Sequence, residues 1–122
     1  MHPDRTRSAR RENLFGGTGV VWVQQLAADD ALPSPFTVVL LCELEPAGRV
    51  GAHAQPHDDE ILLGLEGDAV LYVDRVPHAV VPGRVVGLPL GATLEIDNAS
   101  TAEPFRYLII KARSPPPVTT HP

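Results

Sequence analysis

The sequence predicts an all-β fold, and three observations support this prediction. About eight short apolar runs follow one another along the chain, and turn residues separate nearly all of them. The 13 prolines and 10 glycines act as breaks between runs, which is typical of an antiparallel barrel or sandwich. Helical periodicity is found only weakly, at residues 25–32, where Pro33 and Pro35 end it.

Taken in order, the runs predict strands at residues 19–26, 36–45, 48–55, 61–65, 69–74, 85–88, 93–97 and 105–111. The first, GVVWVQQL, is apolar on both faces at its centre, as in a strand that is covered on both sides. The runs at 61–65 and 69–74 flank a turn at Gly67, and those at 85–88 and 93–97 flank a Pro-x-Gly turn at residues 89–91.

The 122 residues predict one domain, and an apolar content of 43% is enough to build its core. Residues 1–13 are polar and without apolar periodicity, which predicts a flexible arm. Residues 14–113 form the predicted domain. The proline-rich residues 114–122, SPPPVTTHP, cannot join a sheet and predict a disordered tail.

The charges are unevenly distributed. Residues 12–112 carry five basic and 14 acidic side chains, a net charge of −9, whereas the two ends carry five arginines and Asp4. A phosphate backbone requires a basic face, so we expect no nucleic-acid partner for such an acidic domain. The arginine-rich start has two interpretations, a solvated arm or a segment that contacts an acidic surface.

Cys42 is the only cysteine, so no intrachain disulfide can form, and we expect a buried, inert thiol. No segment approaches the roughly 20 apolar residues of a membrane span, and the polar start lacks the apolar middle of a signal peptide. These observations predict a cytoplasmic protein without a membrane partner.

A cluster of polar side chains in residues 48–67, GRVGAHAQPHDDEILLGLEG, is the strongest candidate for a functional site. His53 and Gln55 are two residues apart, so on a strand they point to the same face. Glu60 opens the next apolar run after a turn at Pro56, which brings the three side chains together. An imidazole, an amide oxygen and a carboxylate that converge can bind Fe, Mn, Ni or Zn.

A second pattern lies in residues 83–98, GRVVGLPLGATLEIDN. Together the two patterns resemble the paired motifs of the cupin superfamily. The residues that match the family spacing are Gly48, His53, Glu60 and Gly67 in the first motif and Gly83, Pro89, Gly91 and Asn98 in the second.

The resemblance implies a small jelly-roll barrel, also called a double-stranded β-helix. It also implies a metal site, since ligand-complete cupins use two histidines and a glutamate of the first motif and one histidine of the second. In this chain Gln55 replaces the second histidine, and Leu94 stands where the last one belongs. His57 is either a substitute ligand or, because Pro56 breaks the strand before it, part of a solvated turn over the barrel mouth.

Side-chain alternation then predicts which residues face the lumen. If His53 and Glu60 point inward, the residues at even spacing from them also do. A small molecule bound in the lumen should therefore contact Leu62, Gly64, Leu94 and Ile96, with Tyr72 as a further group that can meet it.

Two functions from different classes follow. The first is a small single-domain cupin that binds a small molecule in the lumen and has a degenerate metal site, with little or no metal. The second is a metal-dependent cupin enzyme of the dioxygenase, isomerase or lyase type that uses His53, Gln55 and Glu60. The apolar strand around Trp22 should not remain a free edge, so we also expect a homodimer.

Overall fold

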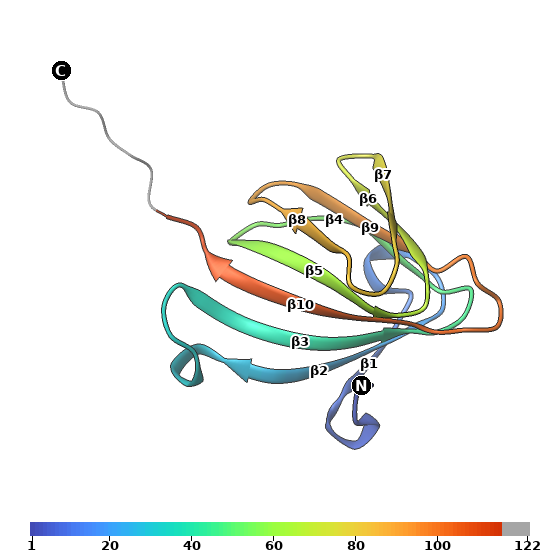
Figure 1. The fold of residues 1–122 in the computed structure, drawn as a ribbon, viewed down its shortest axis with the longest axis horizontal. Coiled ribbons are helices and arrows are strands. Elements are labelled where there is room, and N and C mark those ends of the chain that lie inside the picture. Colours follow the sequence, from blue (N-terminus) through green and yellow to red (C-terminus); the bar gives the residue numbers. More distant parts are fainter. Residues whose placement is uncertain (116–122) are drawn as a thin grey trace.

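The computed structural model of the protein describes residues 1–115, and antiparallel β-strands dominate it (Figure 1). Within these residues the strands are β1 (Ala9–Glu12), β2 (Val20–Ala28), β3 (Phe36–Leu44), β4 (Arg49–Ala54), β5 (Asp58–Glu66), β6 (Ala69–Val73), β7 (Val76–Val80), β8 (Val85–Leu88), β9 (Thr93–Asp97) and β10 (Phe105–Arg113). Three short 3-10 helices join them: η1 (Arg5–Arg7), η2 (Leu14–Gly16) and η3 (Asp29–Ala31). The predicted all-β fold is confirmed.

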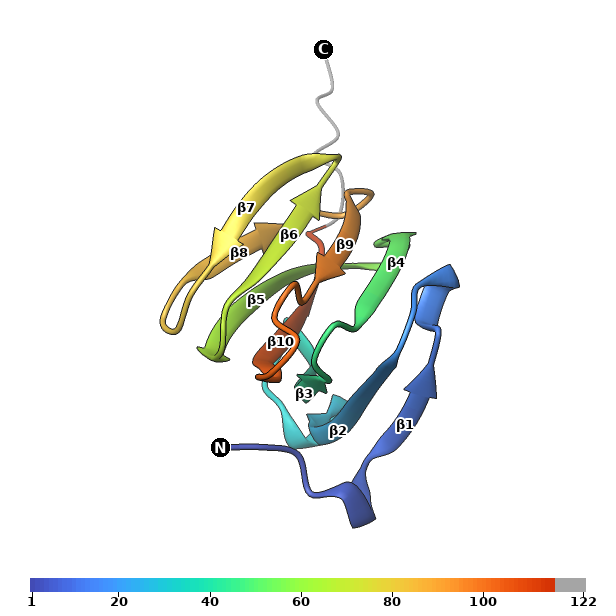
Figure 2. The ribbon, with the colours of Figure 1, turned by 90° about the vertical axis from the view of Figure 1, so that its right-hand side faces the viewer.

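The strands form two sheets that pack face to face (Figure 2). One sheet has six strands in the order β1-β2-β3-β10-β5-β8, and the other has four in the order β4-β9-β6-β7. From β3 onward the chain crosses between the sheets at every connection except the β6–β7 hairpin. Consecutive strands therefore face one another across the interior, which is the jelly-roll arrangement.

The core lies between the two sheets because successive side chains on a strand point to opposite faces. In β10, Phe105 and Tyr107 point inward and are at most 2% exposed. The largest fully buried side chains are Phe105, Leu44, Leu62, Leu71, Leu88, Leu94 and Ile96. Burial of each such side chain contributes about 1.5–3 kcal/mol, so these contacts hold the sheets together.

All of the predicted strands are present, and the structure adds two more, β1 and β7. The weak helical candidate at residues 25–32 is instead the end of β2 followed by η3.

The N-terminal residues differ most from the sequence prediction. Residues 1–13 were expected to be a flexible arm, but Ala9–Glu12 forms β1 and pairs with β2, with Arg10 opposite Trp22. Backbone hydrogen bonds require no apolar side chains, and the arginines gain a partner of their own in the Trp22 ring, which lies 4.6 Å from Arg5 and 5.9 Å from Arg10. Because β1 covers β2, β2 is not a free edge, and the reason we gave for a homodimer is removed.

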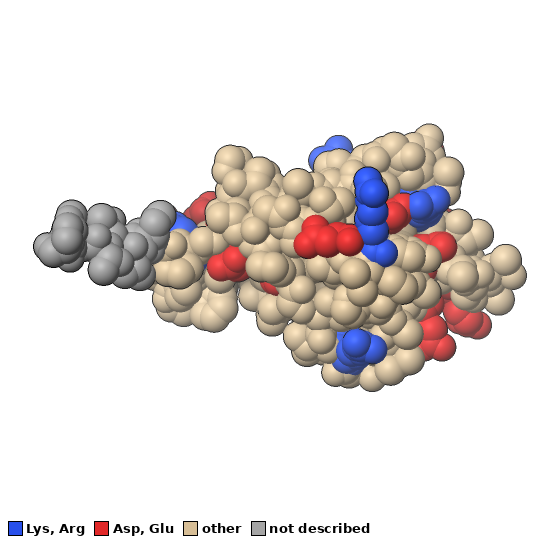
Figure 3. All heavy atoms as spheres, turned by 90° about the horizontal axis from the view of Figure 1, so that it is seen from above, with Lys and Arg blue, Asp and Glu red and all other residues tan. Residues whose placement is uncertain are grey.

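The surface carries acidic and basic side chains interspersed with uncharged ones on the side of the four-stranded sheet, as Figure 3 shows from above. Along the described chain, residues 1–115, no helix is long and apolar enough to cross a membrane.

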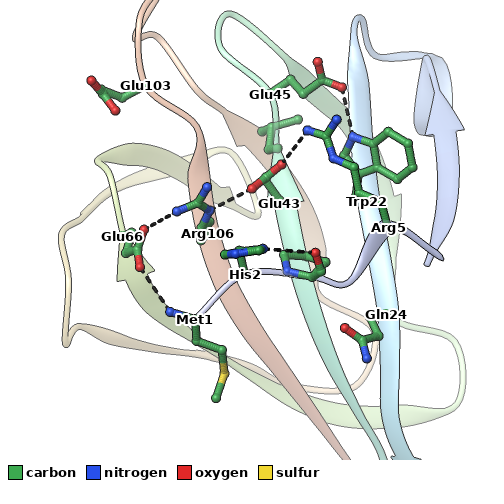
Figure 4. Close-up of polar contacts among 12 residues, drawn as sticks. Met1, His2, Arg5, Trp22, Gln24, Glu43, Glu45, Glu66, Glu103 and Arg106 are labelled. Atoms are coloured by element: carbon green, nitrogen blue, oxygen red, sulfur yellow. Dashed lines mark hydrogen bonds and ion pairs between the residues drawn. The ribbon is translucent and has the colours of Figure 1, made fainter. Parts of the chain in front are cut away.

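The outer face of the six-stranded sheet carries a network of ion pairs beneath the N-terminal residues (Figure 4). Glu43 accepts hydrogen bonds from Arg106 at 2.7 Å and from Arg5 at 3.2 Å, and Arg106 also pairs with Glu66. Burial raises the pKa of Glu43, but the two arginines outweigh it and leave the pKa below its ordinary value. The hollow of about 570 Å³ at this face is lined by Arg5 and Arg106 and by the carboxylates of Asp4, Glu43 and Glu45, and most of these charges are already paired within the chain.

Candidate functional site

A cavity of about 430 Å³ lies between the two sheets and is the best candidate for a functional site. Its wall is largely apolar and includes Val21, Leu40, Leu94 and Ile96. The polar side chains that line it are few, namely Arg11, His53, Gln55, Glu60, Cys42, Tyr107 and Lys111. An apolar cavity of this size with a few convergent polar groups is typical of a small-molecule site.

The entrance to the cavity lies between the N-terminal segment and the end of β4. The lining residues from these two places are exposed, including Arg11, Phe15 and Ala54. In contrast, Leu94 and Ile96 are only 1% exposed. A molecule that enters the cavity would therefore pass the exposed Arg11 and Phe15 before it reaches the apolar interior.

His53 projects from β4 into the cavity. Its Nδ1 lies 3.2 Å from the carbonyl oxygen of Gly51, so Nδ1 donates and Nε2 faces the Gln55 amide at 3.4 Å. Burial lowers the pKa of His53. The histidine is thus held in one orientation, with its unprotonated nitrogen toward Gln55.

Phe15 covers the outer side of the His53 ring. The two rings stack with centroids 3.9 Å apart and planes at 15°. This contact depends on Gly51, because a Cβ there would lie 2.0 Å from the carbonyl oxygen of Phe15. Glycine lets the η2 turn lie directly on β4 and place Phe15 at the entrance.

Glu60 and Lys111 form an ion pair on the cavity wall. They are register partners on β5 and β10, and Lys111 Nζ lies 3.7 Å from Glu60 Oε2. Burial raises the pKa of Glu60, although Lys111 opposes the shift. Glu60 Oε2 is buried and receives no hydrogen bond from the described part of the chain. It is therefore a polar atom on the cavity wall with unused capacity to accept a hydrogen bond.

Cys42 and Tyr107 are register partners on β3 and β10, and both face the cavity. Burial raises the pKa of Cys42 to about 12 and raises that of Tyr107 well above its ordinary value. The thiol stays protonated at neutral pH. The prediction of a buried, inert thiol is consistent with this arrangement.

The predicted ligand-binding residues divide into two groups. Leu94 and Ile96 line the cavity, but Leu62, Gly64 and Tyr72 do not. Leu62 is fully buried in the core, and a Cβ on Gly64 would lie 2.7 Å from the carbonyl oxygen of Val81, so this part of the interior is filled. Tyr72 faces a separate hollow of about 340 Å³ on the four-stranded sheet.

The predicted metal ligands His53, Gln55 and Glu60 do line one cavity, but their surroundings do not suit a divalent metal. They come from facing sheets and not from the single hairpin that was predicted. The lysine ammonium beside Glu60 would repel a cation. Leu94, the register partner of His53, offers no donor atom. His57 is exposed in a bend and does not line the cavity, and residues 1–115 contain no group of three His, Cys, Asp or Glu side chains that could hold a metal.

Lys111, Arg11 and Phe15 are among the cavity-wall residues that were not predicted from the sequence. Lys111 could have been found by alternation, because it follows Phe105, Tyr107 and Ile109 on the inward face of the last strand. Arg11 and Phe15 lie in a segment without apolar periodicity. No sequence signal placed that segment beside β4.

The comparisons with known proteins agree with the fold. A family model described as a cupin domain matches residues 40–111, which include both motifs. The protein belongs to the cupin family. No match to this cupin was found among the curated proteins.

Several solved structures share the architecture of this cupin. A predicted oxalate decarboxylase from Thermotoga maritima matches with a TM-score of 0.82 and 22% identity, over 93% of this chain and 100% of that one. A Cupin 2 conserved barrel domain protein from Salinispora arenicola CNS-205 matches with a TM-score of 0.71 and 24% identity, over 93% of this chain and 88% of that one. At such identities the likeness shows the fold.

Proposed function

We propose that this cupin binds a small organic molecule in the cavity between its sheets. The observation that carries the proposal is Glu60 Oε2, a buried carboxylate oxygen without a hydrogen bond from the described chain, on the wall of a largely apolar cavity. An unsatisfied buried carboxylate costs stability, which a bound donor would recover. A molecule with an apolar body and a neutral donor, such as a hydroxyl or amide N–H group, has the matching chemistry.

The degenerate metal site follows from the same residues. Lys111 supplies the positive charge that a metal would otherwise provide to Glu60, and the Gln55 amide is only a weak neutral donor. Without a second imidazole, the donors favour weak binding of a divalent metal or none. The proposed module therefore works by binding in the lumen.

A metal-dependent enzyme is the second candidate. The similarity in fold to the predicted oxalate decarboxylase from Thermotoga maritima supports it, as does the presence of His53 and Glu60 on one cavity wall. This candidate requires Fe, Mn, Ni or Zn at His53, Gln55 and Glu60. The metal content of the purified protein distinguishes the two functions.

The experiment that tests the binding proposal is a fragment screen by NMR on protein with labelled methyl groups. We expect small amphipathic fragments to shift the methyl signals of Leu94, Ile96 and Ile109, all of which line the cavity. The substitution Leu94→Trp should abolish the shifts because it fills the cavity.

The matched control is Val85→Trp. Val85 is 54% exposed, so this variant adds the same ring outside the cavity. We expect Val85→Trp to bind the fragments like the unmodified protein. The proposal would be contradicted if no fragment in the screen shifted the methyl signals of the cavity residues.

Two other properties are proposed alongside this function. We propose a cytoplasmic location, based on the single buried cysteine Cys42, which cell fractionation tests. We also propose the homodimer predicted from the sequence, with an interface other than the edge of β2, which β1 covers. Sedimentation at micromolar concentration tests it.

A further inference from the structure

We propose that the ligand of this cavity is an organic anion with an apolar body, and that Arg11 of β1 selects it at the entrance. This inference rests on the proposed binding function. It adds the charge of the ligand and the residue that recognises it.

The first support is that Arg11 differs from the other arginines of the N-terminal segment. Arg5 pairs with Glu43 at 3.2 Å, Arg7 with Asp4 at 4.0 Å, and Arg10 with Glu12 at 2.6 Å. Arg11 has no carboxylate within ion-pairing distance among residues 1–115. Its five donors are therefore free to bind a carboxylate from a ligand.

The second support is the direction of the side chain. Arg11 is opposite Val21 in the β1–β2 pair, and both residues line the cavity. Arg10, the preceding residue, points to the other face, where it lies over Trp22. Because side chains alternate along β1, Arg10 lies on the outer face of the sheet and Arg11 lies at the cavity.

The third support is the charge balance of the cavity wall. Glu60 and Lys111 neutralise each other, so Arg11 leaves the wall with a net positive charge. This local charge has the opposite sign to the acidic domain around it. A carboxylate is complementary to it, and the apolar wall formed by Val21, Leu94 and Ile96 suits the remainder of the molecule.

The test uses three probes with the same apolar body: 4-phenylbutyrate, 4-phenylbutanamide and 4-phenylbutylamine. Dissociation constants are measured by NMR titration at low salt. We expect the unmodified protein to bind the carboxylate about tenfold more tightly than the amide, which is the value of one charge-assisted hydrogen bond. We expect the amine to bind most weakly.

The variant Arg11→Gln should weaken carboxylate binding by about tenfold and leave amide binding unchanged, whereas Arg11→Lys should keep part of the preference. Arg10→Gln is the matched control, since it removes the same charge from the neighbouring position on the outer face. We expect Arg10→Gln to change no affinity by more than about twofold, because exposed ion pairs contribute little.

Equal affinities for the carboxylate and the amide, or a preference that persists in Arg11→Gln, would overturn the inference and leave the cavity proposal intact. Failure of all three probes to bind would also overturn it. The fragment screen then decides separately whether the cavity binds small molecules at all.

Discussion

The two ends of the barrel interior use polar side chains in opposite ways. At one end, near Phe105 and Asn98, the buried polar groups are fully hydrogen-bonded. At the other end, near Gln55 and Glu60, polar groups face the cavity and retain unused hydrogen-bonding capacity.

Asn98 illustrates the closed end. It is 1% exposed, and its Nδ2 donates to the carbonyl oxygens of Leu44, Glu45 and Glu103 at 3.0–3.2 Å, while its Oδ1 accepts from the backbone of Ser100. One side chain thereby ties the β3–β4 connection to the β9–β10 connection. The second-motif asparagine has a structural role in this chain.

Gln55 and Glu60 illustrate the open end. Both are buried, yet Gln55 has only a 3.4 Å contact with His53, and Glu60 Oε2 has only the ammonium of Lys111 at 3.7 Å. Such groups contribute little to folding. Two residues that match the motifs therefore differ in role. Asn98 stabilises the barrel through its hydrogen bonds, whereas Glu60 keeps unused hydrogen-bonding capacity at the cavity.

The largest expected effect is on the closed end, at Gly67. Gly67 has φ +76°, and a Cβ there would lie 2.3 Å from the carbonyl oxygen of Pro104, so Gly67→Val should cost about 2–5 kcal/mol. Gly91, near Gln55, has φ +85° with no atom near its Cβ position, so Gly91→Val should cost about 1–2 kcal/mol. Urea unfolding measures both. Equal costs would show that the two ends are equally tightly packed.

The second prediction compares the two buried amides. Asn98→Ala leaves several buried backbone groups without a partner and should cost about 2–3 kcal/mol. Gln55→Ala should cost less than about 1 kcal/mol, because its side chain makes no short hydrogen bond. Thermal unfolding of both variants checks this, and a larger loss for Gln55→Ala would reverse the assignment of the two ends.

The third prediction concerns Leu94→His at the open end. The imidazole would lie beside its register partner His53, and in the absence of metal the buried polar group should cost about 1–3 kcal/mol. Added Zn²⁺ should then raise the unfolding midpoint of the variant, because it binds the folded chain. Leu62→His, equally buried but outside the cavity wall, is the control and should gain nothing from Zn²⁺. The same response to Zn²⁺ in both variants would rule out a restored site.

The smallest expected effect is a pH dependence at Glu60. Burial raises the pKa of Glu60 in the folded protein, so the folded state retains a proton that the unfolded chain has released. Relative to Glu60→Gln, the unmodified protein should therefore lose stability as pH rises from the ordinary glutamate pKa through the folded-state value.

Glu66→Gln is the control of opposite sign. Arg106 lowers the pKa of Glu66, so this carboxylate stabilises the protein above its ordinary pKa, and the contribution is lost as pH falls. Unfolding midpoints measured from about pH 4 to pH 8 test both variants. Parallel curves for Glu60→Gln and the unmodified protein would contradict a raised pKa at Glu60.

The sequence predicted the barrel well because its two motifs and apolar alternation report on buried strands. It missed β1 and β7 for different physical reasons. β1, ARRE, pairs through its backbone and places Arg10 over Trp22, which leaves no apolar pattern. β7 follows a turn at Asp74 and Arg75, where both residues have positive φ, and this dipeptide is not a typical sequence for such a turn.

The candidate site was predicted in part. Alternation predicts that Leu94, Ile96 and Leu62 all face the interior. It cannot tell which inward residues meet side chains from the facing sheet, so it does not separate Leu94 and Ile96, which line the cavity, from Leu62, which is buried in the core. The partner of Glu60 also required the fold. Lys111 lies 51 residues further along the chain, and only the pairing of β5 with β10 brings the two together.

The measurement that tests the account most directly is the metal content of the protein, purified without chelator or affinity metal. In the proposed binding module Lys111, and not a metal ion, meets the Glu60 carboxylate in the cavity. Elemental analysis should therefore find well below one equivalent of Fe, Mn, Ni or Zn per chain. One equivalent of any of them, lost in His53→Ala, would contradict this arrangement and favour the metal-dependent enzyme.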